Sequence, residues 1–151
     1  MRQAAIDTPV GMITVTEEDG VIKRTEWGRP QHPGSAPVLS KAIAEITAYF
    51  EGKTKEFTVP LSKPTSQFAA EFRDALLAIR FGDTLTYGDI AQQLGVSAQA
   101  IGQACGANPI PVIVPCHRVL GANGLGGFSG GTGIETKVAL LRHEGAAGLL
   151  I

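Results

Sequence analysis

The residues best suited to covalent chemistry lie between residues 108 and 119, where the chain reads NPIPVIVPCHRV. Cys116 and His117 are adjacent in this segment. A cysteine is a nucleophile only as its thiolate, and a free thiol with a pKa of about 8.5 is mostly protonated at neutral pH. A base must therefore take the proton, so the pattern indicates nucleophilic catalysis by Cys116.

His117 is the candidate base for Cys116. Neighbouring side chains on a strand point to opposite faces, so His117 reaches the thiol only through a bend, which Pro115 favours, or through a bridging water. Such a base needs an acid to orient it, as in nucleophile–base–acid relays generally. Glu144, at the end of the last expected helix, is the candidate for that role.

Each of these residues also has a plain structural interpretation. A cysteine after an apolar run is often a packing residue, a lone histidine is often structural, and a glutamate at a helix end is often solvated. Metal binding is a third interpretation, but Cys105, Cys116, His117 and His143 show neither Cys-x-x-Cys nor His-x-x-x-His spacing. We therefore expect no metal and no cofactor.

The composition describes an ordinary globular chain. Its 151 residues carry a formal net charge of -1, with 44% hydrophobic and 18% charged residues, which excludes a disordered or polybasic chain. Two cysteines cannot form a disulfide scaffold, and the segment after Met1 lacks the basic and apolar regions of a signal peptide. We therefore expect a cytoplasmic protein, and no apolar run reaches the roughly 18 residues that a membrane span needs.

Two regions of different pattern position the candidate residues. Alternating polar and apolar residues up to Trp27, with a turn at Asp19-Gly20, predict a short antiparallel meander, and near-helical apolar spacing predicts a helix over residues 37–50. We assign residues 1–60 to this small α/β domain, an antiparallel sheet plus one helix. The extended segment 57–64, which contains two prolines, is interpreted as a linker.

Residues 65–151 are expected to form a mainly helical second domain that carries the active-site cysteine. The first helix is predicted from residue 67 to about residue 80, and the last over residues 135–143. Between them, two helices over residues 89–94 and 97–105 form a helix-turn-helix pattern. The cysteine then follows on an active-site strand.

The second helix of this pattern has a flat surface of small residues, with Ala98 and Ala100 beside Gln99 and Gln103. Such a helix can approach a nucleic-acid groove closely, although helical hairpins are also common core elements. The Lys and Arg side chains that normally bind phosphates are scarce, because only three residues are basic from residue 81 onward. Electrostatics alone therefore does not indicate DNA.

The run PCHRV at residues 115–119, preceded by Asn108-Pro109, resembles the signature of the O6-alkylguanine-DNA alkyltransferases, also called methylated-DNA–protein-cysteine methyltransferases. Order and spacing agree further in Tyr87 before the helix-turn-helix, in SGG at residues 129–131, and in the segment from Lys137 to Gly145. The resemblance covers roughly residues 66–145. The strand-rich first domain is compatible with the smaller, variable domain of that family.

The resemblance implies DNA repair by direct, stoichiometric transfer of an alkyl group from O6-alkylguanine to Cys116, with O4-alkylthymine as a further candidate lesion. In this single-turnover enzyme the damaged base is flipped out of the duplex before the thiolate attacks it. His117 acts through a water as the base for the thiol, and Glu144 holds His117. Tyr87 donates its hydroxyl proton to the leaving guanine, and Asn108 braces the turn before the active-site strand.

The resemblance also implies how substrate is bound. Alkylated double-stranded DNA is the expected partner of a monomeric protein, with no role for a membrane. The expected DNA contacts are Ser97, Ala98, Gln99, Ala100, Gln103 and Arg118. The flipped base is expected to lie against backbone of the glycine-rich segment 121–133 and its neighbourhood, where glycine permits close approach. The residues assigned to this pocket are Val119, Phe128, Ser129, Gly130 and Gly131.

Two positions depart from the family pattern. Gln99 stands where the family usually has an intercalating arginine, and Phe128 stands where tyrosine is more usual. Glutamine lacks the guanidinium plane and charge, so we expect either weaker binding to duplex DNA or a preference for single-stranded or already distorted substrate.

Three other functions are considered: a non-catalytic protein that binds alkylated DNA, a helix-turn-helix regulator, and a Cys-His hydrolase. The intact set of catalytic candidates argues against the first. Scarce basic residues argue against the second, and the lack of a separate, distant His–Asn pairing argues against the third.

Overall fold

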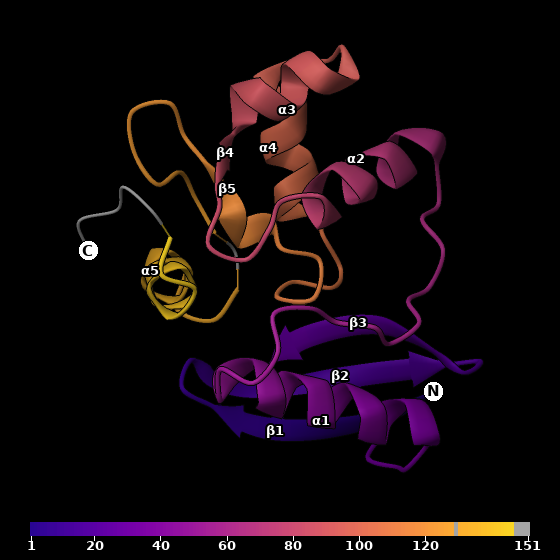
Figure 1. Ribbon diagram of the computed structural model, residues 1–151. Helices are drawn as coiled ribbons and strands as arrows, with labels where there is room; N and C mark the ends of the chain where they lie inside the picture. Colours follow the sequence, from indigo (N-terminus) through magenta and orange to yellow (C-terminus); the bar gives the residue numbers. More distant parts are fainter. Residues whose placement is uncertain (129, 147–151) are drawn as a thin grey trace. The chain divides into compact units, whose positions relative to one another are not determined.

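The computed structural model describes residues 1–128 and 130–146, and the chain divides into two compact units, Met1–Ser62 and Lys63–Ile151 (Figure 1). Each unit has its own buried apolar core. Among the described residues, no helix is both long and apolar enough to cross a membrane.

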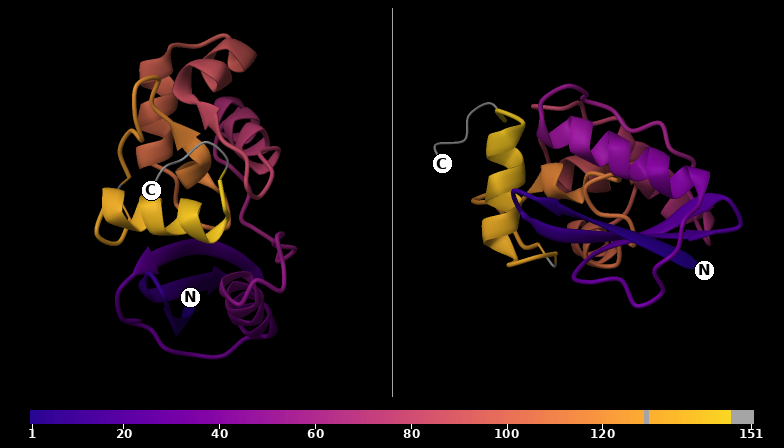
Figure 2. Two further views of the ribbon diagram at one scale, coloured as in Figure 1. Left: turned by 60° about the vertical axis from the view of Figure 1, so that its left-hand side comes forward. Right: turned by 90° about the horizontal axis from the view of Figure 1, so that it is seen from below.

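The first unit is a three-stranded sheet with one helix. The strands β1 (Arg2–Thr8), β2 (Gly11–Glu18) and β3 (Val21–Trp27) pair antiparallel in the order β1-β2-β3. Helix α1 (Pro37–Phe50) packs against all three strands and lies on one face of the sheet (Figures 1 and 2). The core comprises Ile13, Val15, Ile22, Leu39, Ala42, Ile46 and Tyr49. The predicted meander and helix are thereby confirmed.

The second unit is mainly helical, as predicted. Its elements are α2 (Gln67–Leu77), β4 (Leu85–Thr86), α3 (Tyr87–Leu94), α4 (Ala98–Gly106), the 3-10 helix η1 (Cys116–Arg118), β5 (Val119–Leu120) and α5 (Ile134–His143). Helices α2, α3 and α4 contact one another, and α5 contacts η1. Apolar side chains from most of these elements form the core: Leu76, Ile90, Ile101, Ile110, Val119, Leu140 and Leu141 are all fully buried.

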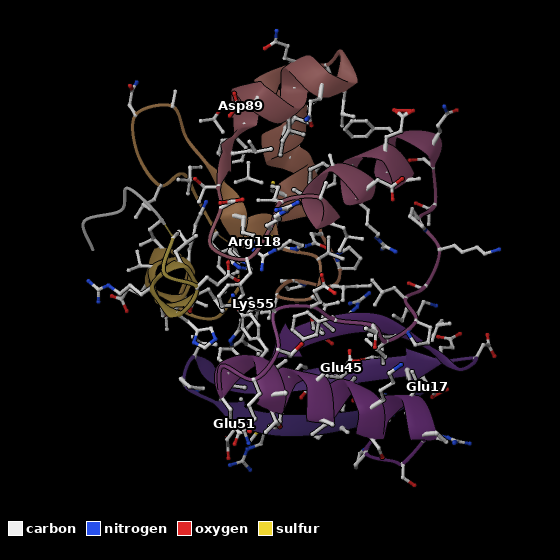
Figure 3. The ribbon with its side chains drawn as sticks, in the orientation of Figure 1. Glu17, Glu45, Glu51, Lys55, Asp89 and Arg118 are labelled. Atoms are coloured by element: carbon white, nitrogen blue, oxygen red, sulfur yellow. The ribbon has the colours of Figure 1, made fainter. Side chains whose placement is uncertain are left out.

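Two helix boundaries differ from the predicted ones by two or more residues. Helix α3 begins at Tyr87, two residues before the predicted start, because Thr86 and Asp89 form a capping box. The Thr86 hydroxyl accepts the Asp89 N–H at 3.0 Å, and the Asp89 carboxylate, visible at the start of α3 in Figure 3, accepts the Thr86 N–H at 2.9 Å. Helix α2 ends at Leu77 instead of continuing to about residue 80, and the carbonyl of Ile79 accepts a hydrogen bond from Arg118.

The predicted active-site strand before Cys116 is wrong. Residues 110–114 are a buried series of turns, and the Val114 N–H donates to the carbonyl of Ile110 at 2.8 Å. The prolines at 109, 111 and 115 have no N–H to donate to a sheet, so a regular strand is disfavoured here. Val112 has φ of 74°, a conformation that costs a β-branched residue roughly 1–3 kcal/mol.

A short parallel strand pair is an element that local patterns did not predict. Leu85 pairs with Val119 and Thr86 with Leu120, so β4 and β5 lie side by side (Figure 1). This pairing joins the start of α3 to the residue that follows the turn at Cys116. The start of α3, which bears Tyr87, is therefore fixed beside the cysteine motif.

Candidate active site

His117 and Glu144 form a buried pair at the centre of the second unit. The His117 Nε2 atom lies 2.8 Å from Glu144 Oε2, and both side chains are 0% exposed. Burial alone would raise the pKa of Glu144, but hydrogen bonds and charges from His117 and Arg118 outweigh it and lower the pKa to about 2. Burial lowers the pKa of His117 despite the opposing effect of Glu144. The pair is therefore an ionised carboxylate and a neutral imidazole at neutral pH.

This pairing determines which imidazole nitrogen can accept a proton. An ionised carboxylate only accepts hydrogen bonds, so Nε2 of His117 carries the hydrogen and Nδ1 has the free lone pair. Nδ1 is buried and has no hydrogen-bond partner among the residues that the structure describes. A carboxylate that fixes the tautomer and leaves the other nitrogen basic is the arrangement that a general base requires.

Cys116 is a buried thiol at the first position of η1, 6% exposed. Burial raises the pKa of the thiol, while a hydrogen bond with Asn108 and the charge of Lys137 act in the opposite direction. The net effect favours a neutral thiol at rest, so Cys116 needs a base to react. The 3-10 turn, closed by the Arg118 N–H on the Pro115 carbonyl at 3.1 Å, provides the bend that adjacent Cys116 and His117 need.

Asn108 closes the loop that leads from α4 to the cysteine. Its Oδ1 accepts the Ile110 N–H at 3.1 Å, and its Nδ2 donates to the Val114 carbonyl at 2.9 Å. Asn108 also acts to lower the pKa of the Cys116 thiol. Its side chain therefore bridges both ends of the turn that precedes Cys116.

Tyr87, at the first position of α3, lies against the glycine-rich segment. A Cβ added to Gly126 would fall 2.8 Å from the Tyr87 hydroxyl, and the backbone of Gly127 hydrogen-bonds that hydroxyl. The Lys137 ammonium lies 5.7 Å from the centre of the Tyr87 ring. The same ammonium donates to the carbonyl of Val119 at 2.6 Å, so Tyr87, the glycine segment and the cysteine turn meet at one point.

Comparisons with known proteins agree with this geometry. The model of the 6-O-methylguanine DNA methyltransferase DNA-binding domain matches residues 67–146, and that of the ribonuclease-like domain of the same methyltransferases matches residues 1–63. The chain belongs to the 6-O-methylguanine DNA methyltransferase family.

Relatives named as methylated-DNA–protein-cysteine methyltransferases resemble the chain along most of its length. The protein from Mycobacterium tuberculosis is 40% identical over 92% of this chain and 89% of its own. The inducible protein from Bacillus subtilis is 42% identical over 89% of this chain and 79% of its own. The crystal structure of Mycobacterium tuberculosis OGT in complex with DNA superposes with a TM-score of 0.85 at 38% identity, covering 96% of this chain and 93% of that one.

The expectation that Arg118 contacts DNA is corrected by its surroundings. Arg118 is 7% exposed, and its guanidinium donates to both carboxylate oxygens of Glu144 at 2.8 and 3.0 Å and to the Ile79 carbonyl at 2.6 Å. It also lies 6.0 Å from the ring centre of Phe81. Arg118 (Figure 3) therefore anchors the Glu144 carboxylate inside the second unit.

The other residues predicted to bind DNA lie on α4 or at its N-cap. Ser97 caps the helix by accepting the Ala100 N–H at 3.1 Å. Gln99 and Gln103, one helical turn apart, are exposed, Ala98 is exposed, and Ala100 is half-buried. Two of the three Lys and Arg residues after position 81, Arg118 and Lys137, are buried.

The pocket residues of the glycine segment are only partly described. Val119 is buried in β5, Phe128 and Gly130 are half-buried, and Gly131 is exposed with φ of 52°. Ser129 lies outside the described residues. Within those residues, no group of three or more His, Cys, Asp or Glu side chains could hold a metal ion.

The sequence analysis gave Lys137 no role beyond its place in the family pattern. It is fully buried and contacts both the glycine segment and the cysteine turn. Its position on the apolar face of a predicted amphipathic helix, next to Leu140 and Leu141, was the available signal, since a buried lysine needs specific partners.

Proposed function

We propose that the protein repairs DNA by transferring an alkyl group from O6 of guanine, with O4 of thymine as a second lesion, to Sγ of Cys116, once per molecule. The observation that carries this proposal is the buried Cys116 thiol beside a His117–Glu144 pair whose remaining imidazole nitrogen is free to accept a proton. The names of the relatives and the DNA-bound neighbour support the same reaction.

The chemistry follows from the protonation states of the site. His117 takes the Cys116 proton through one bridging water, and the thiolate attacks the alkyl carbon in line with the carbon–oxygen bond. That bond breaks, its electron pair goes to the base, and Tyr87 supplies a proton to the leaving base. Burial raises the pKa of the Tyr87 hydroxyl, while the backbone of Gly127 acts to lower it, so the phenol keeps its proton at rest and can supply it. A thioether is a poor leaving group, so Cys116 is used once.

DNA is proposed to bind through the helix-turn-helix formed by α3 and α4. The exposed, small-residue face of α4 fits a groove closely, and base flipping delivers the alkylated nucleotide to the buried sulfur. Tyr87, Cys116, Lys137 and Glu144 all come from one unit of one chain, which supports a monomer. The two free thiols support a reducing compartment such as the cytoplasm.

The intact mass of the protein after incubation with O6-benzylguanine or an O6-methylguanine oligonucleotide tests the function. We expect one benzyl or methyl increment in the wild type, none in Cys116→Ser, and an unchanged increment in Cys105→Ser. An unchanged wild-type mass with retained binding to the alkylated oligonucleotide would instead support a non-catalytic lesion-binding protein.

Replacing Gly126 by alanine should slow alkyl transfer at least tenfold. The added Cβ would lie 2.8 Å from the Tyr87 ring and hydroxyl, and φ of 73° is strained for any L side chain. Tyr87 must therefore move away from the leaving base. The rate constant with O6-benzylguanine measures the effect. Gly124→Ala is the matched control, since its Cβ meets nothing within 4 Å; equal rates in both variants would contradict this placement of Tyr87.

Replacing Gln99 by arginine should accelerate transfer from duplex DNA severalfold. Gln99 is exposed on α4, and a guanidinium adds both charge toward phosphates and a plane that stacks on bases. The rate with free O6-benzylguanine is the internal control and should not change, because that substrate needs no base flipping. A duplex rate that does not rise would show that Gln99 is not at the DNA interface.

A further inference from the structure

The glycine-rich segment that connects β5 to α5 (Figure 1) has little regular structure. Residues 125–128 and 130–133 belong to no helix or strand, and Gly126, Gly131 and Gly133 have positive φ. Glycine has the greatest backbone freedom of all residues, so such a segment loses much conformational entropy when it becomes ordered around a ligand. A contact that holds the segment in place before the ligand arrives therefore favours binding.

Thr136, the third residue of α5, makes such a contact. Its side chain is buried, with the residue 3% exposed. The Thr136 Oγ1 atom accepts the Thr132 N–H at 2.9 Å and lies 3.1 Å from the Thr132 hydroxyl oxygen. A turn closed by the Gly133 N–H on the Gly130 carbonyl at 2.8 Å includes Thr132. The buried hydroxyl therefore fixes the end of the glycine segment at the start of α5.

This hydrogen bond differs from an ordinary helix cap. In a cap, the side chain of the N-cap residue accepts an N–H from the first turn of the helix. The N-cap of α5 is Gly133, which has no side chain to accept one. The Thr136 hydroxyl instead accepts the N–H of Thr132, the residue before the N-cap. The bond therefore holds the segment onto the helix and does not satisfy the N–H groups of the helix itself.

The start of the same stretch is also attached to α5, because the Lys137 ammonium donates to the Gly127 carbonyl at 3.1 Å. Helix α5 in turn contacts η1, which carries Cys116. Between the two attachment points, at Gly127 and Thr132, lie the described residues of this stretch that are assigned to the base pocket: Phe128, Gly130 and Gly131. The backbone that is proposed to receive the flipped base is thus held at both ends by neighbouring residues of one helix.

We propose that Thr136 is a positioning residue that holds the pocket segment in its base-binding conformation through the backbone of Thr132. It acts on the binding of the alkylated base, and the proton transfers of Cys116, His117 and Tyr87 do not pass through it. Thr136 therefore sets the affinity for the base and leaves the rate of alkyl transfer from the bound base unchanged. This role rests on the proposed function, which supplies the base as the ligand of the segment.

The test is the concentration dependence of Cys116 benzylation by free O6-benzylguanine in excess, which separates the half-saturating concentration from the limiting rate. Thr136→Val removes the hydroxyl at nearly constant volume, and Thr136→Ser keeps a hydroxyl. Thr132→Val is the matched control, since it removes a hydroxyl from the same pair but keeps the N–H that Thr136 accepts. Amide hydrogen exchange of the peptide covering residues 126–133, without substrate, is a second measurement.

We expect Thr136→Val to raise the half-saturating concentration about tenfold, as the loss of one hydrogen bond predicts, with an unchanged limiting rate. Amide exchange at Thr132 should become faster. Thr136→Ser should restore most of both quantities, and Thr132→Val should stay within about twofold of the wild type, as a change at an exposed side chain.

Three results would overturn the proposal: a half-saturating concentration that Thr136→Val leaves unchanged, a limiting rate that falls in its place, or an equal rise in Thr132→Val. If the wild type itself gains no benzyl group, the proposed function fails. The exchange measurement then still decides whether Thr136 holds the segment, because unchanged exchange in Thr136→Val would show that it does not.

Discussion

Replacing Arg118 by glutamine should lower the free energy of unfolding by about 3–5 kcal/mol, because it leaves the buried Glu144 carboxylate without the guanidinium that pairs with it. The guanidinium supplies two hydrogen bonds to that carboxylate and one to the Ile79 carbonyl. Benzyl transfer from free O6-benzylguanine to Cys116 should fall by about 100-fold, the contribution expected of a general base that loses its orienting group. Urea unfolding and the benzylation rate at low temperature measure the two effects.

Two further variants, one graded and one a control, test this prediction. Arg118→Lys keeps a charge but not the planar fork, so an intermediate loss is expected. Arg142→Gln removes an exposed arginine from α5 and should change neither quantity. A DNA-contact role for Arg118 predicts the opposite pattern, with stability and benzylguanine transfer unchanged and only transfer from DNA reduced.

The Arg118–Glu144 ion pair makes the free energy of unfolding depend on pH. The pKa of Glu144 is about 2 in the folded chain against an ordinary value of 4.5, so its contribution is fully present above about pH 4.5 and is lost as the pH falls toward 2. The shift corresponds to about 3 kcal/mol. In Arg118→Gln the pKa of Glu144 should rise, and the acid loss of stability attributable to Glu144 should shrink.

Alkylation of Cys116 should lower the melting temperature of the protein. The sulfur is 6% exposed and lies in a turn that Asn108 bridges on both sides, so an added alkyl group must displace packed atoms. Overpacking costs typically 1–3 kcal/mol, and for a chain of this size that lowers the midpoint by roughly 2–10 °C. Thermal unfolding of the methylated and benzylated proteins, each verified by intact mass, measures the effect.

The larger benzyl group should destabilise more than the methyl group. Cys116→Ser treated with the same reagents should melt unchanged, because it accepts no alkyl group. A melting temperature that stays the same or rises after alkylation would mean that the pocket already has room for the group. The strained Val112 backbone, φ of 74°, lies in the same loop and gives it a way to rearrange.

The candidate nucleophile and base of the site could be predicted because the two residues are neighbours in the sequence. Cys116 and His117 are adjacent, and a thiol beside an imidazole indicates its chemistry without a structure. The sheet, α1 and the helices of the second unit follow from local periodicity, capping residues and turn residues. These signals all act within a few residues, which is the range over which a sequence pattern is informative.

The residues that sequence patterns did not place correctly, or gave no role, have partners distant along the chain. Arg118 follows the motif and has the charge of a phosphate ligand, yet its guanidinium pairs in the core with Glu144, 26 residues later. Lys137, which was given no role, donates to a carbonyl 18 residues before it. The expected active-site strand does not form, because the prolines in that segment have no N–H to donate to a sheet. The β4–β5 pair was not predicted because each strand has only two residues, too few to show an alternating pattern.

By itself the sequence indicated the candidate nucleophile, the candidate base and acid, and the two-unit architecture, since each depends on residue chemistry or local periodicity. Only the tertiary structure decided where the buried Arg118 and Lys137 side chains lie and which nitrogen of His117 has no hydrogen-bond partner. It also decided that Tyr87 packs against Gly126. Burial and long-range hydrogen bonding set those features, and the free energy of desolvating a charge depends on its surroundings in space and not on its neighbours in the chain.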